Sequence, residues 1–205
     1  MKLSLVIPAK DKNDPKLLEL IKSIEAQDFP KDQMETLVIT EGTSESAKAI
    51  GIHKARGEVI GILASDNELV EYDFLSSMYN HAYGGAAYPG YYFYEEKDDA
   101  LNRYFSLIGG NDPLAFYMGK NDKFPYLVGN HRITNNCTVG DNGYFIMKSI
   151  IENTYLDNYY HIDNAVETGV DPALLGYRIW HKTGGNIFSF FAKRYRNGLQ
   201  HAFNK

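Results

Sequence analysis

Short apolar runs and segments of helical periodicity alternate through the first 80 residues, and this order constrains the fold more than any other feature. Each of three strand-like runs is followed by a stretch with apolar residues at helical spacing. The predicted strands are residues 3–7, 36–40 and 59–64, and the predicted helices are residues 15–27, 44–56 and 71–81. Alternation of this kind predicts an α/β fold with a mostly parallel central sheet flanked by helices.

Local end signals support two of these helices. Asp14 precedes Pro15, which predicts an N-cap followed by proline at the first helical position. Gly57 follows the second helical segment and predicts its C-terminal end. The later elements begin with a predicted turn and strand at 84–94, a long loop with a helical turn at 109–125, and a glycine-punctuated and then apolar stretch at 138–147. They continue with a helix at 148–153, a partly helical stretch at 163–176, a strand at 177–181 and a basic, aromatic helix at 188–197.

Length, charge and cysteine content limit the classes of protein to consider. A chain of 205 residues is enough for a single domain. The net charge of -5 gives no basic footprint for nucleic acid. The one cysteine, Cys137, excludes an internal disulfide and is compatible with a reducing compartment. Because no apolar run is long enough for a signal peptide or a membrane span, we expect a cytoplasmic protein.

Polar residues follow each of the three predicted strands. They are Lys10 and Asp11 after the first strand, residues 40–42 (TEG) after the second and residues 65–67 (SDN) after the third. In parallel α/β sheets, ligands bind at the carboxyl ends of the strands. The sequence therefore predicts a binding site where these three ends meet at one edge of the sheet.

Four segments resemble, in their order and spacing, the N-terminal half of inverting GT-A glycosyltransferases of family 2. They are LSLVIPAKD, SIEAQDFP, ETLVITEGTSE and ARGEVIGILASDNEL. Later segments resemble the family's acceptor-side strand (TVGDNGYFIMKS), the region of its catalytic base (HIDN), and its late strand with a histidine and the following helix (GYRIWH and FFAKRYRNG). The resemblance implies a single GT-A (Rossmann-like) domain, with a nucleotide-sugar-binding half at 1–80 and an acceptor-side half at 81–205.

The resemblance also implies a nucleotide-sugar donor, a divalent metal and roles for particular residues. Asp66 matches the metal-ligating acid of the Asp-x-Asp motif, and Glu41 matches the acid that binds uracil or guanine. Asp11 matches a position near the donor base, and Asp163 matches the catalytic base. The full set of donor-binding candidates is Pro8, Asp11, Glu41, Ser65, Asp66 and Arg194.

Glycosyl transfer from such a donor needs a counter-charge for the leaving diphosphate and a base for the acceptor hydroxyl. Mn²⁺ or Mg²⁺ supplies the first as a Lewis acid and needs only one or two carboxylates besides phosphates and water. We expect Asp66 as one ligand, with His181 or Glu68 as the second, and histidine suits Mn²⁺ better than Mg²⁺. Asp163 is the candidate base.

Three positions depart from the family pattern and leave other hypotheses open. Ala64 stands at the first acid of Asp-x-Asp, Ile162 precedes Asp163 in place of glutamate, and Thr40 replaces the first acid before Glu41. A catalytically weakened nucleotide-sugar-binding module is therefore the alternative. A nucleotidyltransferase is disfavoured because PAKDKNDP lacks glycine, and the absence of a Gln-x-x-Arg-Trp motif predicts transfer of a single sugar.

Five of the candidate site residues have a plainer alternative role. Asp66 could cap the turn or helix that follows it, and Asp163 could be a helix N-cap. Glu41 could be a solvated turn acid, and His181 could be an ordinary half-buried strand histidine. Arg194 could lie on a solvated helix face.

The sequence says least about the acceptor, for which we expect a glycan or a lipid-linked molecule. The predicted C-terminal helix combines aromatic and basic side chains: Phe188, Phe190, Phe191 and Tyr195 with Lys193, Arg194 and Arg196. Such a surface suits an anionic membrane, so this helix is compatible with peripheral contact at the inner face of the membrane.

Overall fold

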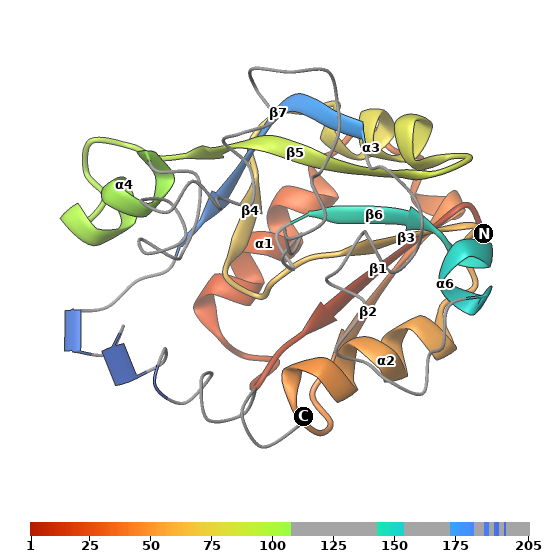
Figure 1. The fold of residues 1–205 in the computed structure, drawn as a ribbon, viewed down its shortest axis with the longest axis horizontal. Coiled ribbons are helices and arrows are strands. Elements are labelled where there is room, and N and C mark those ends of the chain that lie inside the picture. Colours follow the sequence, from red (N-terminus) through yellow and green to blue (C-terminus); the bar gives the residue numbers. More distant parts are fainter. Residues whose placement is uncertain (108–142, 154–172, 183–186, 189–190, 193–194, 196–205) are drawn as a thin grey trace.

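The structure, a computed structural model, describes residues 1–107, 143–153, 173–182, 187–188, 191–192 and 195. These residues form one seven-stranded sheet, in the order β2-β1-β3-β6-β5-β7-β4, with helices on both faces (Figure 1). The strands are β1 (Leu3–Pro8), β2 (Met34–Ile39), β3 (Val59–Ile62), β4 (Asn67–Leu69), β5 (Ala86–Phe93), β6 (Tyr144–Met147) and β7 (Ala173–His181). The helices are α1 (Pro15–Glu25), the 3-10 helix η1 (Lys31–Gln33), α2 (Ser44–Lys54), α3 (Phe74–Ala82), α4 (Ala100–Leu107) and α6 (Lys148–Asn153).

The predicted fold class, an α/β domain with a central sheet flanked by helices, is confirmed. The strands β2, β1 and β3 are neighbours and parallel, as expected for strands joined through helices. β5 and β7 are also parallel, whereas β6 runs antiparallel to β3 and β5, and β4 runs antiparallel to β7. The sheet is therefore evenly mixed rather than mostly parallel, because β6 and β4 run opposite to the strands beside them.

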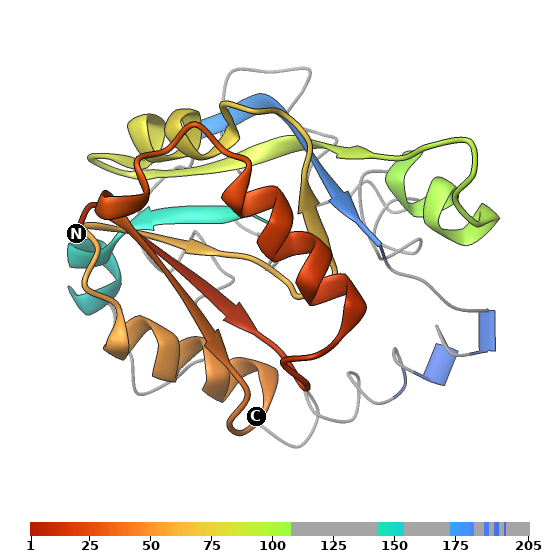
Figure 2. The same ribbon diagram turned by 180° about the vertical axis from the view of Figure 1, so that it is seen from behind.

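Alternate residues of β1 face opposite sides of the sheet and meet different helices. Leu3, Leu5 and Ile7 pack in one apolar cluster with residues of α1 and α3. Val6 packs in a second cluster with residues of α2 and α6. Figure 2 shows α1 crossing the first of these faces. Because helices cover both faces, the central strands are continuous apolar runs rather than alternating ones.

The start of α1 is as predicted, whereas the end of α2 is not. Asp14 accepts a hydrogen bond from the backbone N–H of Lys16 at 2.9 Å, and Pro15 is the first helical residue. α2 ends at Lys54, so Gly57 does not end this helix. Gly57 lies instead where the α2–β3 connection approaches the backbone of β1 too closely for a Cβ atom.

Two further boundaries differ from the prediction. β3 ends at Ile62, and a tight turn leads from it into the short strand β4, which the sequence did not predict. β7 begins at Ala173, so the prediction of partial helix is wrong over residues 173–176. Residues 173–175 pair with β5, and residue 176 continues the same strand, β7. The predicted loop at 109–125 and residues 163–172 lie outside the described residues.

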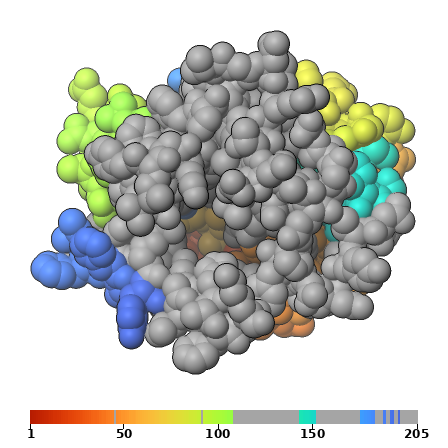
Figure 3. Space-filling model, in the orientation of Figure 1, coloured from red at the N-terminus to blue at the C-terminus, as the bar shows by residue number. Residues whose placement is uncertain are grey.

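The described part of the predicted C-terminal helix lies at the rim of the molecule. Residues 187, 188, 191, 192 and 195 are helical and exposed, and Figure 3 shows them in blue at the lower left. Among the helices that the structure describes, none is long and apolar enough to cross a membrane.

Candidate functional site

The carboxyl ends of β1, β2 and β3 lie side by side, as predicted. The backbone N–H of Ala9 donates to the carbonyl of Ile39 at 2.9 Å, which joins the ends of β1 and β2. The backbone N–H of Leu63 donates to the carbonyl of Val6 at 3.1 Å, which joins the ends of β3 and β1. The polar residues that follow these strands therefore start from one edge of the sheet.

A tight turn over residues 64–67 presents Asp66 at this edge. The backbone N–H of Asn67 donates to the carbonyl of Ala64 at 3.0 Å, and the Asn67 side chain accepts from the N–H of Ala64 at 2.9 Å. The side chain that closes this turn is thus that of Asn67 rather than that of Asp66. Asp66 and Ser65 occupy the two central positions of the turn and are partly exposed.

The antiparallel pairing of β4 with β7 brings His181 to Asp66. Asn67 lies opposite His181 in the register, and the backbone N–H of Lys182 donates to the carbonyl of Asp66 at 2.8 Å. As a result, Nε2 of His181 lies 3.3 Å from Oδ1 of Asp66, with the side chains 7% and 20% exposed. The ring of Tyr92, on β5, lies 6.0 Å from the imidazole, centroid to centroid. The structure thus joins the two residues predicted as metal ligands.

The Asp66–His181 pair has a donor set and a spacing that fit a divalent cation. It offers one carboxylate oxygen and one imidazole nitrogen, a combination that suits Mn²⁺. Two ligands about 2.1 Å from a metal, on neighbouring vertices of an octahedron, stand about 3 Å apart, close to the separation of these two atoms. Within the described residues, no group of three or more His, Cys, Asp or Glu side chains could hold a metal. Such a cation would therefore keep water or phosphate oxygens in its other positions.

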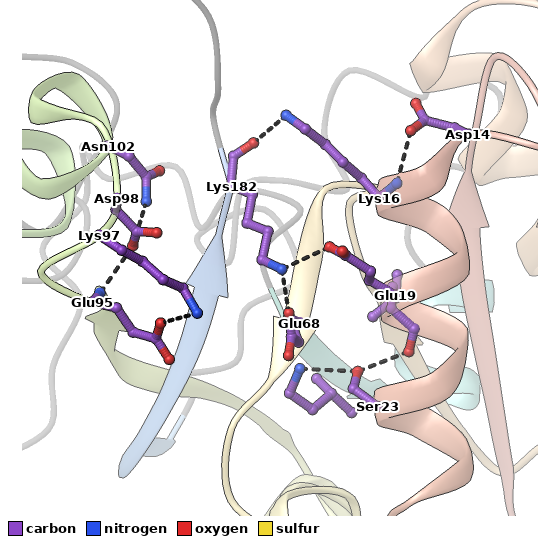
Figure 4. A network of polar contacts seen from close by, with 12 residues as sticks. Asp14, Lys16, Glu19, Ser23, Glu68, Glu95, Lys97, Asp98, Asn102 and Lys182 are labelled. Atoms are coloured by element: carbon purple, nitrogen blue, oxygen red, sulfur yellow. Dashed lines mark hydrogen bonds and ion pairs between the residues drawn. The ribbon is translucent and has the colours of Figure 1, made fainter.

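Glu68, the other residue considered as a second ligand, is engaged elsewhere. Its Oε2 atom lies 2.5 Å from Nζ of Lys182, and the same ammonium lies 2.7 Å from Oε2 of Glu19 on α1 (Figure 4). Burial disfavours the charged form of Lys182, but the hydrogen bonds to both glutamates outweigh this and raise its pKa. The hydrogen bond from Lys182 likewise lowers the pKa of Glu19. Lys182 and Glu19 are therefore charged at neutral pH.

The other donor-binding candidates lie at the same edge but face solvent to different degrees. Pro8 ends β1 and is partly buried. Asp11 is exposed, and its carboxylate accepts from the backbone N–H of Asn13 at 2.9 Å. The Glu41 side chain is 70% exposed and lies 3.8 Å from Nζ of Lys54. The alternative of a solvated turn acid matches this geometry of Glu41.

Two predicted site residues lie outside the described residues: Asp163, the candidate base, and Arg194. Sequence reasoning also missed residues that the structure places beside the site. Lys182 and Glu19 had no motif to mark them, and their contact joins positions far apart in the chain. The one local signal was the position of Lys182 directly after His181.

No protein-family model matches the chain, and no curated protein does. Solved structures do match. The mannosyltransferase PcManGT from Pyrobaculum calidifontis, in complex with GDP-Man and Mn²⁺, has a TM-score of 0.54 at 13% identity, with 95% of this chain and 64% of that chain covered. S. aureus TarS 1-349 in complex with UDP-GlcNAc has a TM-score of 0.53 at 13% identity, with 91% of this chain and 62% of that chain covered.

The chain has a glycosyltransferase fold. It spans less than two thirds of the length of either of these structures. At such low identity the similarity concerns the arrangement of helices and strands and not the chemistry of individual side chains. The resemblance seen in the sequence is therefore confirmed at the level of the fold, and membership of family 2 stays a prediction.

Proposed function

We propose that this protein is a metal-dependent inverting glycosyltransferase that moves a single sugar from a nucleotide-sugar donor to an acceptor hydroxyl or phosphate. The observation that carries the proposal is the Asp66–His181 pair, with 3.3 Å between Oδ1 and Nε2, at the carboxyl edge of the sheet. This is the edge at which ligands bind in α/β sheets. The family 2 resemblance of the surrounding segments supports the same assignment.

In this proposal, each residue at the edge has one task. Asp66 and His181 hold Mn²⁺ or Mg²⁺, which would neutralise the charge that develops on the diphosphate leaving group. Glu41 recognises the base of the nucleotide. Asp163 accepts the proton of the acceptor hydroxyl as that oxygen attacks the sugar from the face opposite the leaving group.

The remaining donor-binding candidates complete the proposed donor site. Pro8, Asp11 and Ser65 line the strand ends along which the nucleotide would lie, and Arg194 is proposed to contact the diphosphate. The donor is a UDP- or GDP-sugar. UDP-GlcNAc and GDP-Man are the donors bound in the two similar structures, and the proposal extends that ligand class to this chain.

The first test is calorimetry with UDP, GDP and several of their sugars, with and without Mn²⁺. We expect one nucleotide to bind in a metal-dependent way, and D66N to remove the metal-dependent part. D163N should abolish transfer while leaving donor binding in place. If no nucleotide binds, with or without metal, the glycosyltransferase proposal is wrong and only the fold is shared.

A nucleotide-sugar-binding module without transfer activity is the second candidate. The observation that favours it is Ala64, which places a methyl group where the resemblance expects an acid at the start of the turn. Its signature is metal-dependent donor binding with neither hydrolysis nor transfer to any acceptor. Slow transfer that depends on Asp163 would reject it.

The acceptor is proposed to be a glycan or a lipid-linked molecule reached from the cytoplasmic face of a membrane. The supporting observation is the exposure of three aromatic side chains near the C-terminal end of the described residues: Phe188 (80%), Phe191 (61%) and Tyr195 (72%). Aromatic side chains of this kind insert at membrane interfaces. Flotation with anionic liposomes at low salt tests the contact, and failure to bind would remove the membrane from the proposal.

A further inference from the structure

Lys182 follows His181 directly, and its backbone and side chain both contact neighbouring elements. Its backbone N–H donates to the carbonyl of Asp66 at 2.8 Å. Its own carbonyl accepts from Nζ of Lys16 at 2.6 Å. Its ammonium lies between the carboxylates of Glu19 and Glu68, as Figure 4 shows. One residue thus ties the end of β7 to α1, to β4 and to the turn that carries Asp66.

The side chain of Lys182 is held in place as well as paired. It is 22% exposed, and its Nζ lies 4.3 Å from the centroid of the Trp180 ring. Hydrogen bonds to two carboxylates and a contact with an aromatic face leave a long, flexible side chain with one favoured conformation. A lysine fixed in this way can transmit its position to the histidine beside it.

Removal of the ammonium would leave two carboxylates facing each other across the gap between α1 and β4. Repulsion between Glu19 and Glu68 would then separate these elements, and β4 begins directly after Asp66. Glu68 would also lose its cationic partner and could compete for a bound cation. Both effects disturb the alignment of Asp66 with His181.

We propose that Lys182 is a positioning residue for the metal site: its clamp between Glu19 and Glu68 holds His181 in register with Asp66 and keeps Glu68 off the cation. This inference rests on the proposed function, because it assumes that Asp66 and His181 bind a divalent metal. It adds a residue that neither the sequence motifs nor the similarity to known structures assigns.

The test is a titration of the protein with Mn²⁺ alone, in which electron paramagnetic resonance measures the free ion. Outer contacts of this kind are typically worth a factor of about 10–100 in metal affinity, so K182M should raise the Kd for Mn²⁺ about tenfold. K182R keeps the charge and should stay within about threefold of the parent. The double variant E68Q/K182M removes the repulsion and should recover most of the lost affinity.

A matched control tests whether removing any lysine beside Trp180 would have the same effect on the Mn²⁺ affinity. Lys97 also lies over the Trp180 ring, at 5.8 Å, but its ammonium pairs with Glu95 and its side chain is 75% exposed. K97M should leave the Kd unchanged. K16M removes the hydrogen bond to the Lys182 carbonyl and a positive charge near Glu19. It should raise the Kd about threefold, and it serves as the test if K182M does not fold.

Several outcomes overturn the inference. The first is an unchanged or lower Kd for Mn²⁺ in K182M. The second is an equal loss of Mn²⁺ affinity in K182M and K182R that E68Q/K182M does not recover. The third, if K182M does not fold, is an unchanged Kd in K16M. D66N and H181A separate this failure from failure of the proposed function. If both abolish Mn²⁺ binding while K182M does not weaken it, only the role of Lys182 is wrong. If the parent protein binds no Mn²⁺, the proposed metal site and the role of Lys182 are both wrong.

Discussion

Asn67 lies opposite His181 in the antiparallel pair of β4 and β7, and its side chain closes the turn that carries Asp66. One buried asparagine thus connects the geometry of the turn to the position of the histidine. The site depends on this relationship, because Asp66 and His181 come from segments that the sequence separates widely. The same residue therefore offers a direct test of how the site is built.

Replacing Asn67 with alanine should destabilise the fold by about 1–3 kcal/mol, because the N–H of Ala64 loses its acceptor in a partly buried turn. Urea unfolding followed by circular dichroism measures the loss. N80A makes the same change at an exposed position of α3 and should cost far less. Equal stability of N67A and the parent protein would contradict the role given to this side chain.

His181 should set the choice of cation at the proposed site. An imidazole ligand favours Mn²⁺, whereas Mg²⁺ prefers oxygen. We therefore expect the parent protein to bind Mn²⁺ more tightly than Mg²⁺, and H181Q to reduce this preference severalfold. Competition of Mg²⁺ against bound Mn²⁺ measures the ratio.

The control for this selectivity experiment is H53Q, at an exposed histidine of α2. It should leave the ratio of the two affinities unchanged. A preference for Mn²⁺ that survives in H181Q would place the nitrogen ligand elsewhere in the chain.

Because of Glu35, the free energy of unfolding should fall as the pH drops below the ordinary pKa of glutamate. Burial raises the pKa of its carboxyl, but hydrogen bonds from Ser4 and from the backbone and guanidinium of Arg56 outweigh this and lower the pKa. A depressed folded-state pKa stabilises the protein above the unfolded-state value of about 4.3. This contribution is lost as the pH falls through the folded-state pKa.

The comparison of E35Q with the parent protein tests this linkage. At pH 7 we expect E35Q to be less stable by about 1–2 kcal/mol, since its hydrogen bonds are no longer charge-assisted. At about pH 3 the difference should shrink, because the parent carboxyl becomes protonated. E25Q, at an exposed position of α1, is the control for the substitution itself, and its stability at pH 7 should stay within about 0.5 kcal/mol of the parent. A constant difference between parent and E35Q at both pH values would contradict the assignment.

The sequence was sufficient for the part of the fold that local patterns determine. Apolar runs and helical spacing predicted β1, β2, β3 and the helices between them, since each pattern lies within one short segment. Asp66 and His181 were also named as metal ligands, Asp66 from the family 2 resemblance and His181 as one of two possible second ligands, and their metal binding stays a prediction. Their contact required the unpredicted strand β4, only three residues long, to pair with β7.

Features that depend on contacts between distant segments were not predictable. The clamp of Lys182 between Glu19 and Glu68 needs α1, β4 and β7 to be in place first. The apolar pattern within one segment does not indicate which strands pair in antiparallel fashion. The mixed character of the sheet was therefore not predicted from the sequence. The same limit applies to Gly57, whose role depends on a strand that it meets only in the folded structure.

Any side chain at Gly57 should destabilise the protein, although the backbone of this residue is not in the left-handed region. A Cβ atom there would lie 2.5 Å from the backbone nitrogen of Ser4, and neither main chain can move without disturbing the β1–β3 pairing. The Ser4 hydroxyl also accepts from the N–H of Gly57 at 2.8 Å, which fixes the two segments together. We expect G57A to lower the free energy of unfolding by about 1–3 kcal/mol.

G176A is the matched control, because a Cβ atom at Gly176 on β7 would have nothing within 4 Å. The stability of the G176A variant should therefore stay within about 0.5 kcal/mol of the parent. Chemical denaturation of both variants decides the matter: if G57A is as stable as G176A, the close approach of the α2–β3 connection to β1 is not what selects glycine at this position.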